Sequence, residues 1–230
     1  MPKQPQRLFL IDGSSYIYRA YYAIRHLSNS QGMATNAIYG FTNMLLKVIR
    51  ESQPDQLAVI YDSKGPTFRK DIYPEYKANR SAMPEDLVPQ IPYIRGVVEA
   101  FNRPGIEKPG YEADDIIATL AGKFAAKGMD VTVVTGDKDM MQIVNDRVCL
   151  LDTMKDKVSG PAEVAERFGG AAKVIEVQAL AGDSSDNVPG VPVIGVKTAK
   201  ALIADFGDIE TLLSNLDQLT VKHRENLENF

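Results

Sequence analysis

Four short runs of apolar residues stand out along the chain, and each is nearly continuous rather than alternating with polar positions. They are RLFLID, LAVIYD, DVTVVT and VCLLD, over Arg7–Asp12, Leu57–Asp62, Asp130–Thr135 and Val148–Asp152. Runs of this kind are typical of strands in a parallel sheet that is covered on both faces. The pattern therefore predicts four buried strands.

Helical periodicity lies between these runs. The segment Asn36–Glu51 places its apolar side chains on one stripe, made of Ile38, Phe41, Leu45, Val48 and Ile49. The segment Asp115–Lys127 does the same with Ile116, Leu120 and Phe124, and Gly128 ends it. Strands that alternate with helices predict an α/β fold, with a mostly parallel central sheet flanked by helices.

Two regions depart from this alternation. Ser63–Pro92 is polar, basic and rich in proline, and it is too long for an ordinary connection. Leu180–Phe206 reads as a helix, a Gly/Pro-rich hairpin and a second helix. We expect an α/β core over residues 1–170 that includes the insertion at about 63–92, followed by a helix–hairpin–helix subdomain over 171–230.

Composition narrows the class of protein. Of 230 residues, 44% are apolar and 24% charged, which excludes disordered and collagen-like chains. The single cysteine, Cys149, excludes an internal disulfide and favours a reducing cytoplasm. The apolar run near the N-terminus is too short for a signal peptide, and no run approaches a membrane span, so we expect no membrane partner.

Carboxylates mark the ends of three predicted strands, at Asp12, Asp62 and Asp137. In open α/β sheets, ligands bind at this edge. Aspartate is also a common turn and capping residue, so one such residue alone would mean little.

Further acidic clusters strengthen the case for a site. They are Glu112, Asp114 and Asp115 before a helix, Asp137 and Asp139 after a strand, and Asp183 and Asp186 at the hairpin. Helix capping explains one or two acids in a first turn well, and three poorly. If all nine converge, their repulsion requires cations.

All-oxygen ligands select Mg²⁺ or Mn²⁺. Two ions about 3.5–4 Å apart would use this many carboxylates, and such pairs serve displacement at phosphorus. The net charge of −4 also changes its meaning, because removing these nine leaves 21 acidic residues against 26 Lys and Arg. A mildly basic body around a metal-filled acidic centre suits a polyanionic substrate.

The two irregular regions carry features that suit nucleic acid. In the hairpin, Gly190 and Gly195 would let backbone approach a ligand, and Lys197 and Thr198 at the next helix start would hold a phosphate. The insertion interleaves basic and aromatic residues, as single-strand channels do. A tight interhelical turn and a solvated basic loop are the simpler explanations of these two features.

Taken together, six motifs resemble the 5′-nuclease domain of the flap endonuclease family, found at the N-terminus of bacterial DNA polymerase I. They are DGSSYIYRAYYA (12–23), Tyr61-Asp62, YPEYKANR (73–80), YEADD (111–115), TGDKDM (135–140) and GDSSDNVPGVP (182–192). The resemblance implies a PIN-like core and a structure-selective 5′-3′ exonuclease and flap endonuclease. Its substrates would be DNA with a 5′ flap or 5′ end and RNA primer–DNA junctions, in replication and repair.

The resemblance also implies roles for individual residues. Asp12, Asp62, Glu112, Asp114 and Asp115 match the first metal cluster of the family, and Asp137, Asp139, Asp183 and Asp186 match the second. Lys77 and Arg80 match basic catalytic residues at the base of a helical arch, and Tyr18 and Arg19 match contacts to the nucleotide near the cut. It further implies two Mg²⁺ ions, replaceable by Mn²⁺, and a monovalent cation at the hairpin.

A bacterial, nucleoid-associated monomer linked to a polymerase domain is implied as well, with this chain as a truncated part that cannot itself copy DNA. One residue departs from the family pattern, since Val193 stands where the family hairpin usually has glycine. A β-branched residue there is strained if its φ must be positive. The rivals are a PIN-type ribonuclease, a non-catalytic DNA-binding module and a phosphatase or receiver domain, and each explains too few of these features.

Overall fold

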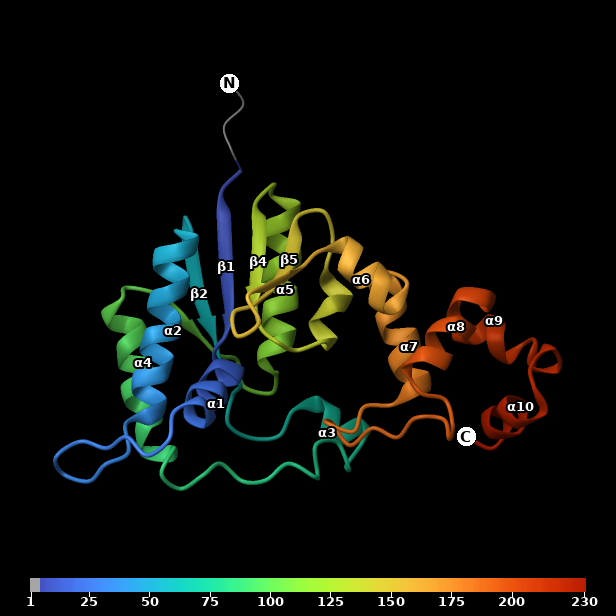
Figure 1. Ribbon diagram of the computed structural model, residues 1–230, viewed down its shortest axis with the longest axis horizontal. Coiled ribbons are helices and arrows are strands. Elements are labelled where there is room, and N and C mark those ends of the chain that lie inside the picture. Colours follow the sequence, from blue (N-terminus) through green and yellow to red (C-terminus); the bar gives the residue numbers. More distant parts are fainter. Residues whose placement is uncertain (1–4) are drawn as a thin grey trace. The chain divides into compact units, whose positions relative to one another are not determined.

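The computed structural model describes residues 5–230, which form two compact units. The first contains residues up to 68 and residues 81–159, and the second contains residues 69–80 and 160–230. Figure 1 labels most of the helices and strands. No helix within the described range is long and apolar enough to cross a membrane.

The first unit is built on one six-stranded sheet with the order β3-β2-β1-β4-β5-β6. Its strands are β1 (Arg7–Asp12), β2 (Gln56–Ile60), β3 (Gly105–Ile106), β4 (Asp130–Val134), β5 (Val148–Asp152) and β6 (Lys157–Ser159). All neighbouring pairs are parallel except β5 with β6. The predicted mostly parallel α/β sheet is confirmed.

Helices cover both faces of this sheet. They are α1 (Gly13–Ala23), α2 (Asn36–Ser52), α4 (Ile91–Ala100) and α5 (Ala113–Ala126). Phe9 and Ile11 of β1 belong to one buried cluster with Phe41 and Leu45 of α2, so the alternate β1 residues point to the opposite face. There α5 packs against β1, β2 and β4.

The structure corrects the stripe expected on the helix after residue 112. The buried residues of α5 are Ala113, Ile117 and Ala121, whereas Ile116 and Leu120 remain partly exposed, as does Phe124. The two stripes are adjacent on the helix surface. Small alanine side chains let α5 approach the sheet closely, so the stripe with the larger residues lies beside the contact rather than in it.

Most boundary differences are small. The strands predicted to end at Asp62 and Thr135 end at Ile60 and Val134, and the helix predicted from Asp115 begins at Ala113. The short strands β3 and β6 were not expected. Within the polar segment after Ser63, the chain forms α3 (Phe68–Ile72) and a 3₁₀ turn at Val88–Gln90.

The second unit is helical apart from its loops. Its helices are α6 (Pro161–Phe168), α7 (Val174–Ala181), α8 (Val196–Phe206), α9 (Ile209–Leu213) and α10 (Val221–Glu228). Helices α7 and α8 pack on one another and flank the Gly/Pro-rich hairpin, as predicted. The segment 69–80 groups with these helices, because its residues contact the hairpin.

Candidate active site

Asp12 ends β1, next to the point where the strand order of the sheet reverses. β1 pairs with β2 on one side and with β4 on the other, so the ends of β1 and β4 flank the switch in strand order. The Asp12 side chain is only 6% exposed. Its Oδ1 accepts the Ser15 backbone N–H at 2.9 Å, and its Oδ2 accepts the Thr135 hydroxyl at 3.0 Å. One carboxylate thus caps α1 and ties β1 to β4.

The turn after Asp12 requires a residue without a side chain. A Cβ atom on Gly13 would lie 2.7 Å from Val59 Cγ1 and 2.8 Å from the Ile60 carbonyl oxygen. Helix α1 therefore starts directly against β2, which fixes Asp12 at the sheet edge. The Ser14 hydroxyl then accepts the Asp62 backbone N–H at 2.9 Å, which holds the end of the second strand beside it.

Three carboxylates act on one another at this edge. Burial raises the pKa of the Asp12 carboxyl from its ordinary 3.8 to about 6. The hydrogen bonds from Ser15 and Thr135 oppose this rise in the pKa, and the negative charges of Asp62 and Asp137 add to it. The negative charges of Asp62 and Asp137 thus act on Asp12 at this edge of the sheet.

The acids at the start of α5 also serve as caps. The Asp62 Oδ1 accepts the Ala113 backbone N–H at 2.8 Å, and the Asp115 Oδ2 accepts the Glu112 backbone N–H at 3.0 Å. Glu112 is buried and Asp114 is partly buried. The capping explanation therefore accounts for Asp62 and Asp115, while metal binding would use their remaining oxygens.

The loop after β4 contains one positive side chain, Lys138, and its Gly136 lies against a second, Arg19. The Asp137 Oδ1 accepts the Asp139 backbone N–H at 2.9 Å, and Lys138 Nζ lies 3.4 Å from Asp139 Oδ1. A Cβ atom on Gly136 would lie 1.4 Å from Arg19 Nη2, so this glycine makes room for the guanidinium. The Arg19 side chain is held by Asp152 at 3.1 Å.

The nine predicted metal ligands fall into two groups. Seven lie in the first unit, and Asp183 and Asp186 lie in the second. Within residues 5–230, no three carboxylate, histidine or cysteine side chains are grouped so that they could hold an ion as they stand. The acidic edge of the first unit therefore consists of neighbouring carboxylates rather than a finished coordination shell.

Asp186 is surrounded by the segment predicted to form the arch. The Arg80 guanidinium lies 2.6 Å from Asp186 Oδ1, Lys77 Nζ lies 3.9 Å from Asp186 Oδ2, and the Tyr76 hydroxyl donates to Oδ2 at 2.9 Å. The backbone is joined too, because the Lys77 N–H donates to the Asp186 carbonyl at 2.9 Å. We call these contacts the Asp186 cluster.

The two hairpin glycines differ in their surroundings. A Cβ atom on Gly190 would lie 2.2 Å from the Ala181 carbonyl carbon, so this glycine is needed for packing against the end of α7. Gly195 precedes α8 and has open space around it, and Lys197 is exposed. Val193 has a φ of 63°, which is the left-handed conformation that strains a β-branched residue.

Residues 7–169 match the family described as 5′-3′ exonuclease, N-terminal resolvase-like domain, and residues 170–230 match 5′-3′ exonuclease, C-terminal SAM fold. The chain belongs to the 5′-3′ exonuclease family. It is a nuclease, and the carboxylates at its sheet edge lie in the part of the chain that matches the first of these two domains.

Curated relatives of this exonuclease chain include two kinds of protein. It is 48% identical over 235 residues to DNA polymerase I of Rhizobium leguminosarum, covering 98% of this chain and 23% of the relative. It is 41% identical over 212 residues to a 5′-3′ exonuclease of Aquifex aeolicus, covering 92% and 73%. The chain thus spans about a quarter of the length of the polymerase relatives that it matches.

Solved structures support the exonuclease fold. The T5 D15 protein co-crystallised with metal ions has a TM-score of 0.78 at 21% identity, covering 97% of this chain and 84% of that one. The catalytic core of Rad2 in complex with DNA substrate has a TM-score of 0.63 at 18% identity, covering 98% and 73%. At these identities the likeness concerns the fold alone.

Sequence reasoning missed three residues of this exonuclease. Thr135 is buried, donates to Asp12 and accepts the Asp137 backbone N–H at 3.1 Å. Ser14 and Tyr76 hold Asp62 and Asp186. The only signal was that Thr135 and Ser14 lie in motifs singled out for their acids, and that Tyr76 is one of the aromatic residues interleaved with Lys77 and Arg80 in the insertion. Tyr18, predicted to face DNA, is partly buried and packs against the core of the first unit.

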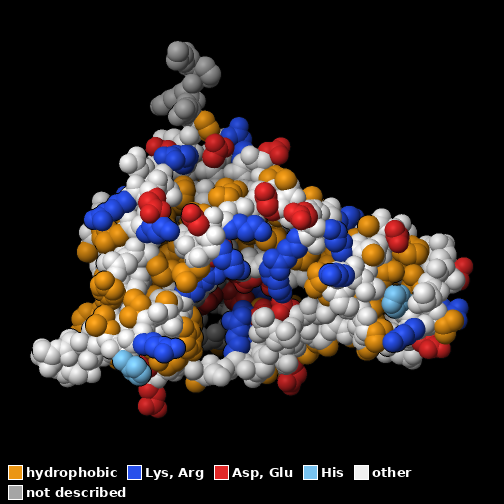
Figure 2. All heavy atoms as spheres, viewed as in Figure 1, with side chains coloured by type: hydrophobic (Ala, Val, Ile, Leu, Met, Phe, Trp, Pro, Cys, Tyr) orange, Lys and Arg blue, Asp and Glu red, His pale blue; other side chains and the backbone are white. Residues whose placement is uncertain are grey.

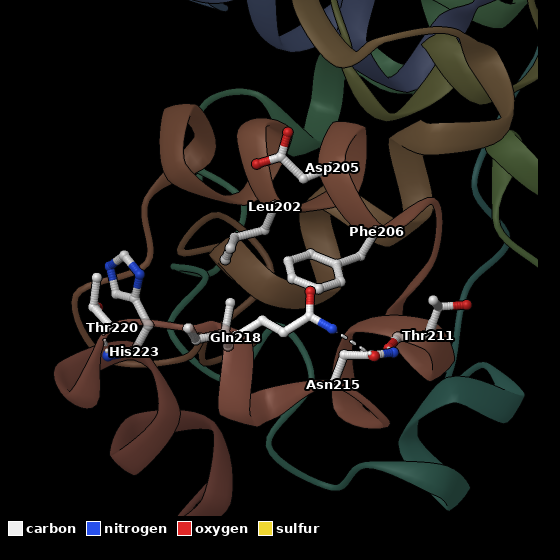
Figure 3. A pocket seen from close by; sticks show the side chains of 9 residues that line it. Leu202, Asp205, Phe206, Thr211, Asn215, Gln218, Thr220 and His223 are labelled. Atoms are coloured by element: carbon white, nitrogen blue, oxygen red, sulfur yellow. Dashed lines mark hydrogen bonds between the residues drawn. The ribbon is translucent and has the colours of Figure 1, made fainter.

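Other surface features add context. The face of the molecule in Figure 2 carries many Lys and Arg side chains, with Asp and Glu side chains between them. A hollow of about 550 Å³ lies within the second unit, where Leu202 and Phe206 of α8 face His223 of α10 (Figure 3). The Gln218 side-chain amide donates to Asn215 at one side of it. None of the predicted site residues is among those that line this hollow.

Proposed function

We propose that this chain is a structure-selective 5′ nuclease that depends on Mg²⁺, uses two metal ions, and hydrolyses phosphodiester bonds at 5′ ends and 5′ flaps of DNA. The observation that carries the proposal is the repulsive set of Asp12, Asp62 and Asp137 at the switch point of a parallel sheet. Asp12 is buried, and a cation beside it would offset both the cost of its burial and the repulsion from the other two carboxylates.

The donor set fits a hard divalent ion. Asp12, Asp62, Glu112, Asp114, Asp115, Asp137 and Asp139 offer only oxygen, which favours Mg²⁺ or Mn²⁺ over zinc. Asp183 and Asp186 would contribute to the second ion. When bound, such ions lower the pKa of a bound water and neutralise charge at the phosphate. The T5 D15 protein was co-crystallised with metal ions and the T5 5′-exonuclease was solved with bound zinc, which supports a divalent requirement.

The chain's own residues would orient the substrate. Lys77 and Arg80 would stabilise charge on the transferring phosphate once they leave Asp186. Arg19 lies against Gly136, next to Asp137, where a cation would steer a phosphate toward the acids. Gly195, Lys197 and Thr198 would grip a duplex backbone through N–H groups at the start of α8. Gly190 would shape this loop, and Tyr18 would contact the nucleotide near the cut.

The relatives suggest the setting. The Rhizobium relative is a DNA polymerase I and the Rad2 core was solved with DNA substrate. We therefore place the activity in the removal of RNA primers and displaced strands during replication and repair. The protein would act as a bacterial, nucleoid-associated monomer linked to a polymerase domain. Its domains would be a core over 1–170 and a DNA-binding subdomain over 171–230, with a monovalent cation at the hairpin.

The direct test is cleavage of a labelled duplex that carries a 5′ flap, with Mg²⁺ and with EDTA. We expect cuts at the flap junction only with Mg²⁺, and slower cutting of the same strand as a blunt duplex or as a free single strand. Equal rates on all three substrates would contradict structure selectivity. Full cleavage in EDTA would contradict the metal requirement.

A further inference from the structure

Another hollow lies in the first unit, and Asp115 is the one predicted metal ligand among the residues that line it. It has a volume of about 570 Å³, within the range of roughly 300–1,000 Å³ that is usual for ligand pockets. The residues that matter for its chemistry are Phe68, Lys108, Tyr111, Ile116, Thr119 and Leu120. We call it the aromatic pocket.

Two partly exposed rings line the aromatic pocket. Phe68 is 43% exposed and Tyr111 is 40% exposed, and their centroids lie 6.1 Å apart with planes inclined at 60°. The backbone of Tyr111 is fixed, because its carbonyl accepts the Ser63 hydroxyl at 3.2 Å. Stacking of a flat apolar ligand on such partly exposed rings is favourable, because it removes apolar surface from water.

The floor of the aromatic pocket is the stripe of α5 that does not reach the core. Ile116 and Leu120 are only partly buried, because Ala113, Ile117 and Ala121 make the contact with the sheet. The apolar periodicity of α5 therefore serves two surfaces. One stripe stabilises the fold, and the neighbouring stripe gives the pocket an apolar wall.

The lining of the aromatic pocket contains one positive side chain, Lys108, and one negative side chain, Asp115. Lys108 Nζ lies 4.5 Å from the centre of the Tyr111 ring, so its charge stands directly over the ring. Asp115, a predicted metal ligand, also lines the pocket, and its side chain accepts the Glu112 backbone N–H. A ligand that combines a flat ring with an anion, next to the acidic edge, fits this arrangement.

We propose that the aromatic pocket binds one unpaired nucleobase of the DNA substrate, stacked on Tyr111 and Phe68, with an adjoining phosphate at Lys108. The inference rests on the proposed nuclease function and deepens it, because it assigns a binding place for single-stranded substrate. Stacking on rings tolerates every base, since each has a flat aromatic face.

Abasic scanning tests this proposal directly. A series of 5′-flap substrates carries one abasic position each, moved one nucleotide at a time through the single strand, and Kd is measured with Ca²⁺ in place of Mg²⁺. With the wild-type chain, one position should weaken binding by about fivefold or more, which is the range for loss of one stacked base. With Tyr111→Leu or Phe68→Leu, the intact substrate should show the same loss, and the abasic position should cause no further one.

Matched variants separate the pocket from general effects. Tyr93→Leu removes an exposed ring on α4, and Lys123→Met removes an exposed cation on α5, so both should bind like wild type. Lys108→Met should weaken binding and reduce the salt dependence by one contact. A fluorescent 2-aminopurine at the sensitive position should be quenched by wild type and not by Tyr111→Leu.

The possible outcomes separate the pocket from the enzyme. If wild type cuts the flap in Mg²⁺ but no abasic position affects Kd, the aromatic pocket does not hold a base and the proposal is overturned. If wild type binds with a sensitive position but does not cut, the nuclease assignment fails and the pocket stands. If Tyr111→Leu binds every substrate like wild type, the sensitive base is held elsewhere.

Discussion

Asp12 and Asp186 are both aspartates that the sequence assigns to metal binding, yet their surroundings differ in kind. Asp12 is almost fully buried, receives hydrogen bonds from an amide and a hydroxyl, and feels the negative charges of Asp62 and Asp137. Asp186 has Arg80 and Lys77 beside its two oxygens and accepts the Tyr76 hydroxyl.

The two aspartates differ in the source of their positive charge. At Asp12 the neighbours named above hold no counter-charge, so a bound cation would relieve the repulsion. At Asp186 the counter-charge is already built into the same unit. A metal at Asp186 would compete with Lys77 and Arg80, and would release them for a phosphate. The two predicted roles, metal ligand and phosphate contact, therefore exclude one another in the Asp186 cluster until its contacts open.

The largest effect should come from removing one of the repelling carboxylates. Asp137→Ala should lower the cleavage rate by at least ~1,000-fold, about 4 kcal/mol, because in the proposed mechanism a catalytic ion would lose a ligand. Binding of the flap substrate in Ca²⁺ should persist, since the acids do not grip DNA. Asp146→Ala, on an exposed loop of the same unit, is the control. A rate for Asp137→Ala within tenfold of wild type would refute the two-ion reading.

The next effect concerns the stability of the metal-free protein. The pKa of Asp12 is about 6 in the folded chain and 3.8 ordinarily, so the folded state holds its proton more tightly. Stability in EDTA should therefore fall as the pH rises from about 4 to about 6, by about 3 kcal/mol from this group, and then stay constant. Asp12→Asn keeps a capping residue and should remove this decline.

Urea denaturation in EDTA at several pH values measures the effect. Wild type and Asp12→Asn should have similar unfolding free energies near pH 4, and the variant should be more stable at pH 7. Asp146→Asn should follow wild type, because that side chain is exposed. A constant difference between Asp12→Asn and wild type across the pH range would mean that Asp12 is not the group that titrates.

The acidic edge could be predicted from sequence because buried parallel strands have nearly continuous apolar sequences. Asp12 ends such a run, and Asp62 and Asp137 follow one within three residues, so their shared edge follows from strand direction alone. The close match of β1 and β5 to the expected ranges has the same cause. Strands β3 and β6 escaped detection because two or three residues give no periodicity.

The surroundings of Asp186 could not be predicted in this way. Arg80 is 106 positions away in sequence, and Asn187 joins the Glu75 carbonyl across 112 positions. Loop-to-loop contacts of this kind leave no periodic signal. The prediction of the buried face of α5 was wrong for another reason. Alanine is a weak marker of burial, and the larger residues Ile116 and Leu120 favoured the neighbouring stripe.

The third effect addresses the arch side of the comparison. Lys77→Ala should lower the single-turnover cleavage rate by ~100-fold or more, about 2.7 kcal/mol, because the transferring phosphate loses a charge partner. Flap binding should change much less. Lys70→Ala, an exposed lysine of the same segment, should leave the rate unchanged. Weaker binding with an unaltered single-turnover rate would make Lys77 a phosphate contact only.

The smallest effect concerns backbone strain in the second unit. Val193 has a φ of 63° and is 54% exposed, so its side chain adds little packing to offset a conformation that costs a β-branched residue about 1–2 kcal/mol. Val193→Gly should relieve this cost, but glycine also raises the conformational entropy of the unfolded chain, which lowers the unfolding free energy by about 0.5–1 kcal/mol. The net result should be a gain in unfolding free energy of about 0.5–1 kcal/mol, since the two terms oppose each other.

The sign of this last effect is checked with a second valine in the same region. Val196 is 47% exposed and begins α8, where glycine has no strain to relieve. Val196→Gly should therefore destabilise by about 0.5–1 kcal/mol, opposite to Val193→Gly. Denaturant unfolding of the two variants and wild type, at one pH in EDTA, gives both differences under the same conditions. If both variants lose stability, the left-handed conformation of Val193 does not strain the hairpin. The unfavourable free energy of the folded protein would then lie at the acidic edge, where Asp12 is buried beside other carboxylates.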